Sequence, residues 1–315
     1  MNTHIDGKGD ALNICGVVVA FYPDEKKIQA LLDVLAQQVQ LLYVADNSDM
    51  DCSPLSLVAT IPLHYQFFGE NRGVAAAHNA GIAFARTKGC THVLLMDQDS
   101  LPHADMVHRL VQAERKLCGQ GKKVAAVGPL CFHPQRHYYE PFLQCRAGRV
   151  TTLRCVPDQA SLLPVAHLIS SGSLISIHLL DSVGDMEESL FIDYIDIEWA
   201  FRASAKGYAC YAVCGAVLEH YLGGVEKKGI GGMSRTFSSY GATRLYYQFR
   251  NLVSLAKRGY VPRTWLVYHV MRYMAPRFLA HTLFLPPRLQ HLHMIIRGIM
   301  DGMRGKTGPL FQIRL

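Results

Sequence analysis

Short apolar runs alternate with amphipathic stretches over the first 132 residues of the chain. The apolar runs end in polar residues, as buried parallel strands do, whereas the stretches between them carry apolar residues at helical spacing. The expected strands are residues 14–23, 39–49, 64–73, 91–100 and 123–132. The expected helices are residues 27–38, 73–89 and 102–117. Asn71 could cap the second helix. This alternation predicts an α/β fold with a mixed, mostly parallel sheet flanked by helices.

The pattern is less regular in the second half of the chain. Residues 132–168 are rich in Arg, Pro and His and contain only short strand patterns. The next expected elements are a strand at 168–177, a helix with acidic residues at 189–207 and a strand at 208–224. From about residue 239 the pattern becomes helical and basic. We therefore expect an α/β domain at 1–240 and a basic helical extension at 241–315.

Composition limits the class of protein. The chain has 315 residues, of which 50% are hydrophobic and 18% charged, so it can form a large globular core. Its first ten residues lack an apolar signal core, and the best apolar stretch, residues 265–287, is interrupted by Arg and Pro, so no membrane span is expected. The nine cysteines lie mostly in apolar runs, which favours reduced thiols and a cytosolic protein. Cys210 and Cys214 form a close pair, but zinc binding would require a second pair of ligands.

Charge is distributed unevenly along the chain. Residues 241–315 contain 12 Lys and Arg and one acidic residue, whereas residues 1–240 contain 20 basic and 24 acidic residues. Such a basic region suggests contact with a polyanion, either an anionic membrane surface or a nucleic acid. The sequence contains no recognised nucleic-acid-binding module, so we expect no nucleic-acid partner.

Asp97 and Asp99 follow an apolar run in the stretch VLLMDQDS. Because side chains alternate along a strand, the two carboxylates face the same way and Gln98 faces the other. Two like charges this close repel each other unless a cation lies beside them, and Mg²⁺ is commonly held by carboxylates together with substrate phosphates. The spacing therefore predicts a metal–diphosphate site, although a solvated turn after a strand would have the same sequence.

Other strand ends carry polar side chains at the same predicted edge, where α/β sheets bind ligands. Tyr22 ends the first strand and Asp46 the second. The Asp46 carboxylate could accept a hydrogen bond from the N3–H of a uracil or thymine ring. It could equally be a turn residue, because the stretch DNSD favours Asx turns.

Acidic residues also lie near the start of the helix expected at 189–207. Asp193 and Asp196 would share a helix face, and Glu198 follows them. The helix dipole alone would favour acids there. Alternatively, one of them is a general base whose pKa the apolar neighbours raise. His220, at the end of the next apolar run, could be structural or, near the two aspartates, a metal ligand suited to Mn²⁺.

The chain resembles inverting glycosyltransferases of family 2 in an ordered set of motifs between about residues 14 and 255. The motifs are VVVAFYPD, VADNSD, ENRGVAAAHNAGIAFA, VLLMDQDS, ISSGSLIS, ESLFIDYIDIEWAFRA, LEHYLGG and RLYYQFRN. The resemblance implies the GT-A fold. The segments MDQDS, FIDYIDIEW and YYQFRN resemble in particular the bacterial rhamnosyltransferase branch. That branch implies dTDP-L-rhamnose as donor and lipopolysaccharide O-antigen or another cell-surface polysaccharide as product.

The resemblance also implies roles for individual residues. Asp97 and Asp99 match the metal-binding DxD motif, with Mg²⁺ or Mn²⁺ as cofactor and His220 as a third ligand. The residues expected to bind nucleotide and donor are Tyr22, Asp46, Asn71, Arg72, Gly73, Asp97, Ser171 and Gly172. Asp196 aligns with the catalytic base. However, Ile195 stands where many relatives have an acid and Glu198 where a second Asp is common, so Asp193 is a rival base.

The implied reaction is a single displacement with inversion. Asp196 would deprotonate an acceptor hydroxyl, while the metal and nearby basic groups stabilise the departing dTDP. Candidates for the basic groups are Arg235, Arg244 and Arg250. They lie in or near a Gly-rich segment that could be a lid over the diphosphate or an ordinary connector.

The resemblance further implies a glycan or polyprenyl-linked acceptor and a cytoplasmic protein on the inner face of the bacterial membrane. The basic C-terminal helices suit an anionic membrane surface, but they could instead pack on the domain or on a second copy in a homo-oligomer. The alternative hypotheses are a UDP-sugar donor, a metal-dependent nucleotidyltransferase or phosphohydrolase, and a non-catalytic binding protein.

Overall fold

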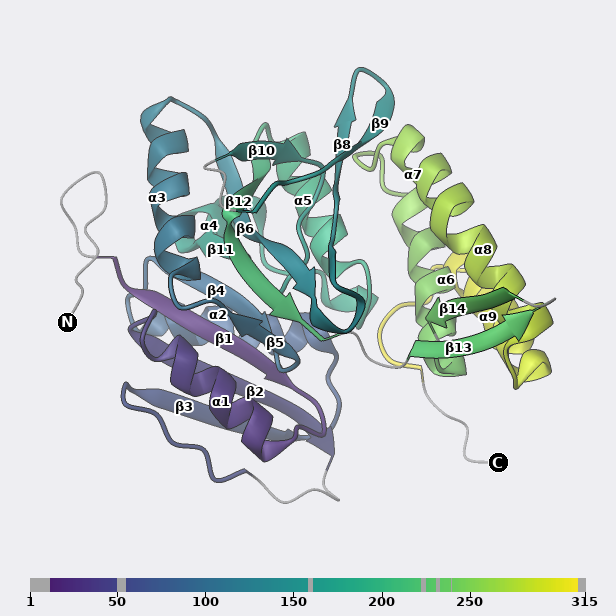
Figure 1. The fold of residues 1–315 in the computed structure, drawn as a ribbon, viewed down its shortest axis with the longest axis horizontal. Coiled ribbons are helices and arrows are strands. Elements are labelled where there is room, and N and C mark those ends of the chain that lie inside the picture. Colours follow the sequence, from purple (N-terminus) through teal and green to yellow (C-terminus); the bar gives the residue numbers. More distant parts are fainter. Residues whose placement is uncertain are drawn as a thin grey trace.

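The computed structural model describes residues 12–49, 55–157, 161–221 and 240–310 in full, and the backbone alone at 225–230 and 233–238. Over these residues, a ten-stranded mixed sheet forms the centre of the molecule and helices cover both of its faces (Figure 1). The main strand order is β10-β12-β6-β11-β4-β1-β2-β3, with β5 paired to β12 and β7 paired to β6. The predicted α/β architecture is confirmed.

The N-terminal half supplies parallel strands. They are β1 (Ile14–Ala20), β2 (Leu41–Asp49), β3 (Leu63–Gly69) and β4 (His92–Asp97). Every residue of β1 is buried, because helices pack on both faces of a parallel sheet. The helices are α1 (Glu25–Leu35), α2 (Val74–Thr87) and α3 (Met106–Gly119). The core on one face contains α1 and α3, and the core on the other contains α2.

Beyond β4 the sheet becomes mixed. The strands there are β5 (Ser100–Pro102), β6 (Val124–His133), β7 (Tyr138–Tyr139), β10 (Leu162–Val165), β11 (Leu174–Ser176) and β12 (Ala209–His220). β12 runs parallel to β6, whereas β11 runs antiparallel to β4. An antiparallel neighbour brings its amino end to the carboxyl end of β4, so the segment just before β11 lies beside Asp97.

Several predicted elements differ in extent. The region 132–168 contains a hairpin of β8 (Phe142–Arg146) and β9 (Arg149–Leu153). The strand expected at 168–177 is reduced to β11, because α4 (Ile177–Val183) begins immediately after it. The helix expected at 189–207 is a short turn, η2 (Glu188–Leu190), followed by α5 (Ile195–Ala205). The Gly-rich segment contains the paired strands β13 (Val225–Ile230) and β14 (Met233–Ser238).

The C-terminal region is helical, as expected. It comprises α6 (Ala242–Ala256), α7 (Arg263–His269), the π turn η3 (Val270–Met274), α8 (Ala275–Leu279), the π turn η4 (Ala280–Phe284) and α9 (Arg288–Met303). α6 and α9 pack so closely that a Cβ at Gly298 would lie 2.5 Å from the carbonyl oxygen of Tyr246. Trp265 of α7 is fully buried, with its ring 5.2 Å from that of Phe201 in α5. These helices therefore share a core with the α/β region.

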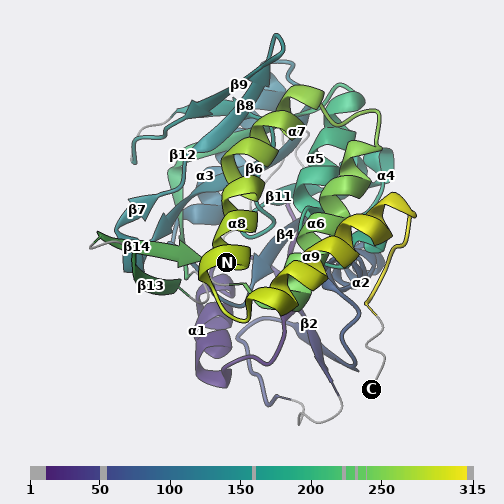
Figure 2. The ribbon, with the colours of Figure 1, turned by 90° about the vertical axis from the view of Figure 1, so that its right-hand side faces the viewer.

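Figure 2 shows α7, α8 and α9 on the near side of the molecule, outside the sheet. Among the described residues, no helix is long and apolar enough to cross a membrane. The division of the chain at residue 240 stays a prediction.

Cys155 and Cys214 form a disulfide bond. The prediction that the cysteines are reduced was therefore wrong for this pair, which is separated by 59 residues in the sequence. Neither an odd cysteine count nor apolar neighbours can show which thiols meet in space. Because Cys214 is bonded to Cys155, a zinc site at Cys210 and Cys214 is also excluded.

Candidate functional site

Asp46 and Asp97 lie on the two sides of the carboxyl end of β1. In the strand register, Ala20 of β1 pairs with Asp46 of β2, and Val19 pairs with Asp97 of β4. Neighbouring strands are about 4.8 Å apart, so the two aspartate backbones lie about 10 Å from each other. The predicted meeting of these strand ends at one edge is confirmed.

Asp97 ends β4 and faces an acidic environment. Burial, together with the negative charge of Asp99, raises the pKa of its carboxyl to about 7, although the nearby Arg244 guanidinium opposes the shift. Gln98 turns the other way, as expected, and holds the end of β1. Its amide oxygen accepts from the Phe21 N–H at 2.9 Å, and its amide nitrogen donates to the Phe21 carbonyl at 3.0 Å.

A chain of hydroxyl groups connects the acidic turn to His220 at the end of β12. The Asp97 N–H donates to Ser171 Oγ at 3.1 Å, and the Ser171 hydroxyl donates to Ser100 Oγ at 2.8 Å. Ser100 Oγ in turn lies 2.7 Å from Nδ1 of His220. Both serines are buried, so this chain fixes the imidazole relative to the end of β4.

The donor set at this point fits a divalent cation. Nδ1 of His220 lies 3.8 Å from Oδ1 of Asp99, and Asp99 is close enough to Asp97 to raise its pKa. Carboxylate oxygens suit Mg²⁺ or Mn²⁺, and an imidazole favours the second. Across the described parts of the chain, however, no three His, Cys, Asp or Glu side chains already converge as a metal cluster.

Asp46 is buried rather than presented to solvent. Its Oδ1 accepts from the Ser48 N–H at 2.9 Å, which is the Asx turn considered above, and its Oδ2 accepts from the Tyr65 hydroxyl at 2.7 Å. Its side chain is 1% exposed. By contrast, Tyr22 is half exposed, with φ of 46°, and its hydroxyl donates to Asp49. A contact between Asp46 and a pyrimidine stays a prediction.

The loop before α2 is held by backbone geometry. The sequence predicted that Asn71 caps the helix, and this was wrong. Its Oδ1 accepts from the Gly73 N–H at 3.0 Å, and Gly73 itself is the N-cap. Gly73 has φ of +87°, and a Cβ there would lie 2.6 Å from the carbonyl oxygen of Phe191. Arg72 is about half exposed and pairs with Glu70 at 3.0 Å. The glycine therefore lets this loop meet the segment that precedes α5.

Ser171 and Gly172 form the turn that enters β11. Ser171 belongs to the hydroxyl chain described above. Gly172 has φ of +82°, and a Cβ would meet Pro129 at 2.5 Å, so this position requires glycine for the turn itself. Donor binding by these two residues stays a prediction.

The segment before α5 has an unusual backbone. Phe191, Asp193 and Tyr194 all have positive φ, between 62° and 68°. Such conformations are costly for residues other than glycine and are often kept at functional sites. Because of this turn, α5 begins only at Ile195, and Asp193 lies outside it. The expectation that Asp193 and Asp196 share a helix face was therefore wrong.

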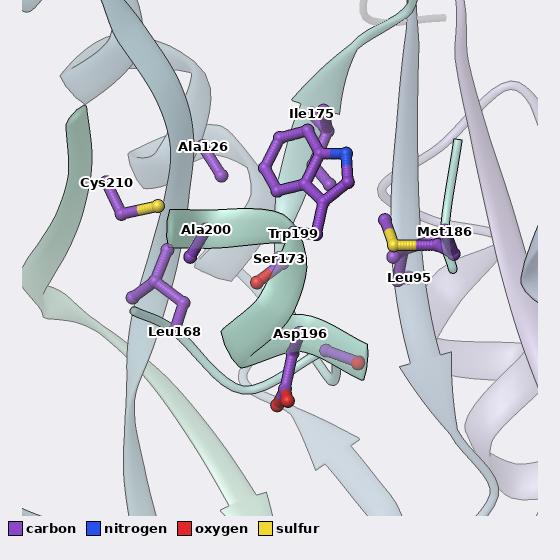
Figure 3. A pocket seen from close by; sticks show the side chains of 11 residues that line it. Leu95, Ala126, Leu168, Ser173, Ile175, Met186, Asp196, Trp199, Ala200 and Cys210 are labelled. Atoms are coloured by element: carbon purple, nitrogen blue, oxygen red, sulfur yellow. The ribbon is translucent and has the colours of Figure 1, made fainter. Parts of the chain in front are cut away.

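Asp196 lies in the first turn of α5, at the edge of a small apolar cavity, with its carboxylate pointing away from Trp199 (Figure 3). Burial, together with the charges of Asp97 and Asp193, raises the pKa of this carboxyl to about 7, although the Ile197 N–H, which donates to it at 2.8 Å, opposes the shift. The predicted effect of apolar neighbours on its pKa is confirmed. Asp193 instead pairs with Arg244, whose Nη2 lies 3.0 Å from Oδ1.

Glu198 lies in a buried ion-pair network, contrary to the catalytic role expected for it. Its side chain is 0% exposed; Oε1 is 2.9 Å from Arg258 and 3.0 Å from Arg202, and it accepts from the Tyr260 hydroxyl. The network joins α5 to the segment that links α6 and α7. Glu198 therefore fixes the helix that carries Asp196 and is not available to a substrate.

The three arginines expected near the diphosphate have different environments. Arg244 is about half exposed and lies near Asp97 and Asp193. Arg250 is 1% exposed and donates to the carbonyl oxygens of Ser189, Leu190 and Gly308, so it holds the chain before α5 and was wrongly expected to bind the donor. The side chain of Arg235 lies outside the described residues.

The sequence did not point to Ser100 or Tyr65, which hold His220 and Asp46. The only local signal for Ser100 is its place directly after the two aspartates. Nothing near Tyr65 in the sequence indicates its partner.

Solved structures define the class of fold. The chain resembles S. aureus TarS 1–349 in complex with UDP-GlcNAc, with a TM-score of 0.53 and 13% identity over 94% of this chain and 82% of that chain. It also resembles GalNAc-T7 with UDP, GalNAc and Mn²⁺, with a TM-score of 0.51 and 10% identity over 93% of this chain and 56% of that chain. The protein thus has the GT-A fold of glycosyltransferases.

Sequence comparison matches one part of the chain to a known family. Residues 16–147 match the family described as Glycosyl transferase family 2, so this part of the chain is a family 2 domain and the protein is a glycosyltransferase. Over 300 residues the chain is 27% identical to the dTDP-rhamnosyl transferase RfbF of Shigella flexneri, covering 94% of this chain and 97% of that protein.

Proposed function

We propose that the protein transfers L-rhamnose from dTDP-L-rhamnose, with inversion, to a hydroxyl of a glycan or polyprenyl-linked acceptor in the synthesis of an O-antigen-type polysaccharide. The observation that carries the proposal is the closeness of Asp196 to Asp97 at the carboxyl edge of the sheet. Burial, together with the negative charge of Asp97, raises the pKa of the Asp196 carboxyl to about 7. The similarity to RfbF along nearly the whole chain supports rhamnose as the sugar.

Asp196 is the proposed base. A pKa near 7 lets a carboxylate accept a proton effectively at neutral pH, and the apolar cavity behind it limits hydration. Asp193 is the weaker candidate, because its carboxylate forms an ion pair with Arg244. The base takes the proton of the acceptor hydroxyl. The hydroxyl oxygen attacks the anomeric carbon of the donor, and dTDP departs. Glu198 holds α5 in place and takes no part in this proton transfer.

Asp97, Asp99 and His220 are the residues that would hold Mg²⁺ or Mn²⁺. When bound, the cation would supply positive charge for the diphosphate. The exposed guanidinium of Arg244 lies near the same acidic turn and would neutralise further phosphate charge. Tyr22, Asp46 and the loop of Asn71, Arg72 and Gly73 are proposed to bind the nucleoside, with Asp46 oriented by Tyr65.

The C-terminal helices are proposed to contact the inner face of the cytoplasmic membrane, where a lipid-linked acceptor would be found. Met271, Leu279 and Leu283 are 68%, 49% and 54% exposed, respectively, on the outer helices seen in Figure 2. Basic residues greatly outnumber acidic ones there, and the single acid, Asp301, is paired with Lys306 at 2.9 Å. Exposed apolar side chains combined with positive charge suit an anionic bilayer surface.

A panel of nucleotides tests the donor. Thermal unfolding would be measured with dTDP-L-rhamnose, dTDP, UDP-glucose and UDP-GlcNAc, each with and without Mn²⁺, since a ligand stabilises a protein in proportion to the logarithm of its concentration over Kd. We expect the largest rise in melting temperature with dTDP-L-rhamnose and Mn²⁺. A shift with a UDP-sugar and none with dTDP-L-rhamnose would overturn the donor assignment.

Phosphorus NMR of the products then tests the reaction. Glycosyl transfer releases dTDP, whereas a nucleotidyltransferase or phosphohydrolase would release dTMP or pyrophosphate. Asp97→Ala should abolish dTDP release; full activity in this variant would contradict the proposed metal site.

A further inference from the structure

A groove of about 410 Å³ lies between the β8–β9 hairpin and α7, which stand side by side in Figure 1. Pockets that bind small molecules commonly have volumes of about 300–1,000 Å³. The residues that line it are Gly148, Val150, Arg263, Thr264, Val267 and Tyr268. No residue of the acidic turn is among them, so the groove is distinct from the proposed donor site.

The groove is connected to the catalytic turn through α7. Tyr268 lines the groove, and the next residue, His269, has its Nε2 2.9 Å from the hydroxyl of Tyr194. Tyr194 precedes α5 and is two residues from Asp196. The ring of Tyr273 lies 6.2 Å from that of Tyr268 and 5.2 Å from that of His269. Aromatic side chains thus extend from the groove to the turn that carries the proposed base.

The lining of the groove suits a carbohydrate. A pyranose ring has an apolar C–H face that packs on aromatic and aliphatic side chains, such as Tyr268 and Val150, and hydroxyl groups that need hydrogen-bonding partners. The Arg263 guanidinium and the Thr264 hydroxyl supply such partners at the rim, where both residues are exposed.

We propose that this groove binds the sugar residues of the acceptor glycan that lie beyond the sugar receiving the transferred residue. The inference rests on the proposed glycosyl transfer with Asp196 as base, and it adds a preference for acceptors of more than one sugar. α7 then has two roles: it completes the core through Trp265 and presents the acceptor chain through Tyr268.

Thr264→Trp tests the proposal, because the exposed position lets an indole ring enter the groove without disturbing the core. Val58→Trp is the control, since Val58 is equally accessible, at 68% exposed, and does not line the groove. The probes are p-nitrophenyl monosaccharides and trisaccharides with the same terminal sugar, assayed by dTDP release at saturating dTDP-L-rhamnose. Size-exclusion chromatography and circular dichroism would be recorded for each variant.

For the wild-type protein we expect KM to be at least fivefold lower for a trisaccharide than for the monosaccharide. Thr264→Trp should raise the trisaccharide KM to the monosaccharide value, while the slow hydrolysis of donor without acceptor stays unchanged. Val58→Trp should behave as wild type. The inference would be overturned if the wild-type protein had the same KM for the monosaccharide and the trisaccharide, or used neither of them. Equal effects of the two variants on the trisaccharide KM would also overturn it.

Two outcomes separate this inference from the proposed function. If the wild-type protein releases dTDP from dTDP-L-rhamnose but chain length has no effect, only the role of the groove is wrong. If it releases no dTDP from that donor, the proposed function itself fails. A change of oligomeric state caused by Thr264→Trp alone would assign the groove to a second copy of the chain and overturn the inference.

Discussion

Ser100 Oγ lies 2.7 Å from Nδ1 of His220, between the acidic turn and the end of β12. Partners of this kind orient a histidine ligand and commonly change metal affinity about 10- to 100-fold. We therefore expect Ser100→Ala to weaken Mn²⁺ binding about tenfold, measured by titration calorimetry in the presence of dTDP. Ser182→Ala is the control, because Ser182 is an exposed serine in α4 and belongs to no part of the proposed metal site. Unchanged Mn²⁺ affinity in Ser100→Ala would show that His220 needs no such orientation.

Asp196→Asn and Asp193→Asn distinguish the two candidate bases. If Asp196 is the base, its amide variant should lose about 10²- to 10⁴-fold in kcat with little change in the Kd of dTDP. Asp193→Asn should instead retain most of kcat and should leave dTDP binding unaltered or strengthen it, because it frees the Arg244 guanidinium from its ion pair. Steady-state kinetics and nucleotide titration measure both quantities. The reverse order of kcat losses would assign the base to Asp193.

The pH profile provides an independent test of Asp196. Because burial and the charges of Asp97 and Asp193 raise the pKa of this carboxyl to about 7, kcat should rise with pH and level off above about 7. Stability should change in the opposite direction: the folded state holds this proton more tightly than the unfolded chain. The contribution of this carboxyl to the free energy of unfolding is therefore fully present below about pH 4 and is lost as the pH rises to about 7.

Urea denaturation between pH 4 and 8 would measure this effect on stability. Asp196→Asn, which cannot titrate at this position, should reduce the decline seen in the wild-type protein, and the part that comes from the raised pKa of Asp97 should remain. An identical decline in the variant would show that the carboxyl does not titrate in this range.

Glu198→Gln should destabilise the protein by about 3–5 kcal/mol, because it removes the fully buried carboxylate that pairs with the partly buried guanidinium of Arg258. Glu187 contacts the same guanidinium at 3.0 Å but is 33% exposed, so Glu187→Gln should cost only about 1 kcal/mol. Urea denaturation measures both losses. Equal losses would show that burial does not distinguish the two pairs.

Membrane contact can be tested with a triple variant, Met271→Glu, Leu279→Glu and Leu283→Glu. We expect at least a tenfold loss of binding to phosphatidylglycerol vesicles in a sedimentation assay, because the changes remove exposed apolar surface and add negative charge. Val58→Glu is the control, at an exposed apolar residue in the N-terminal half of the chain. Binding of the triple variant at the wild-type level would exclude these helices as the contact.

Local patterns identified the side chains at strand ends but not the roles of all charged residues. Asp97, Asp99 and Asp46 were found because the carboxyl ends of parallel strands share an edge. Glu198 was expected to be catalytic because it stands where the resembled family commonly has a second Asp, and Arg250 was expected to bind the donor because it lies near the Gly-rich segment. Their partners, Arg258 for the first and Gly308 for the second, lie about 60 residues away, so only the folded chain shows that both are structural.

The sequence alone determined the alternation of strands and helices, the meeting of polar strand ends and the basic character of the C-terminal region. These follow from periodicities of two and 3.6 residues and from counts of charge, which are local properties. The tertiary structure decided which cysteines pair, where α5 begins, and which carboxylate forms an ion pair with a guanidinium. Burial and long-range contacts set those outcomes, and they raise the pKa of Asp196 while pairing Asp193 with Arg244.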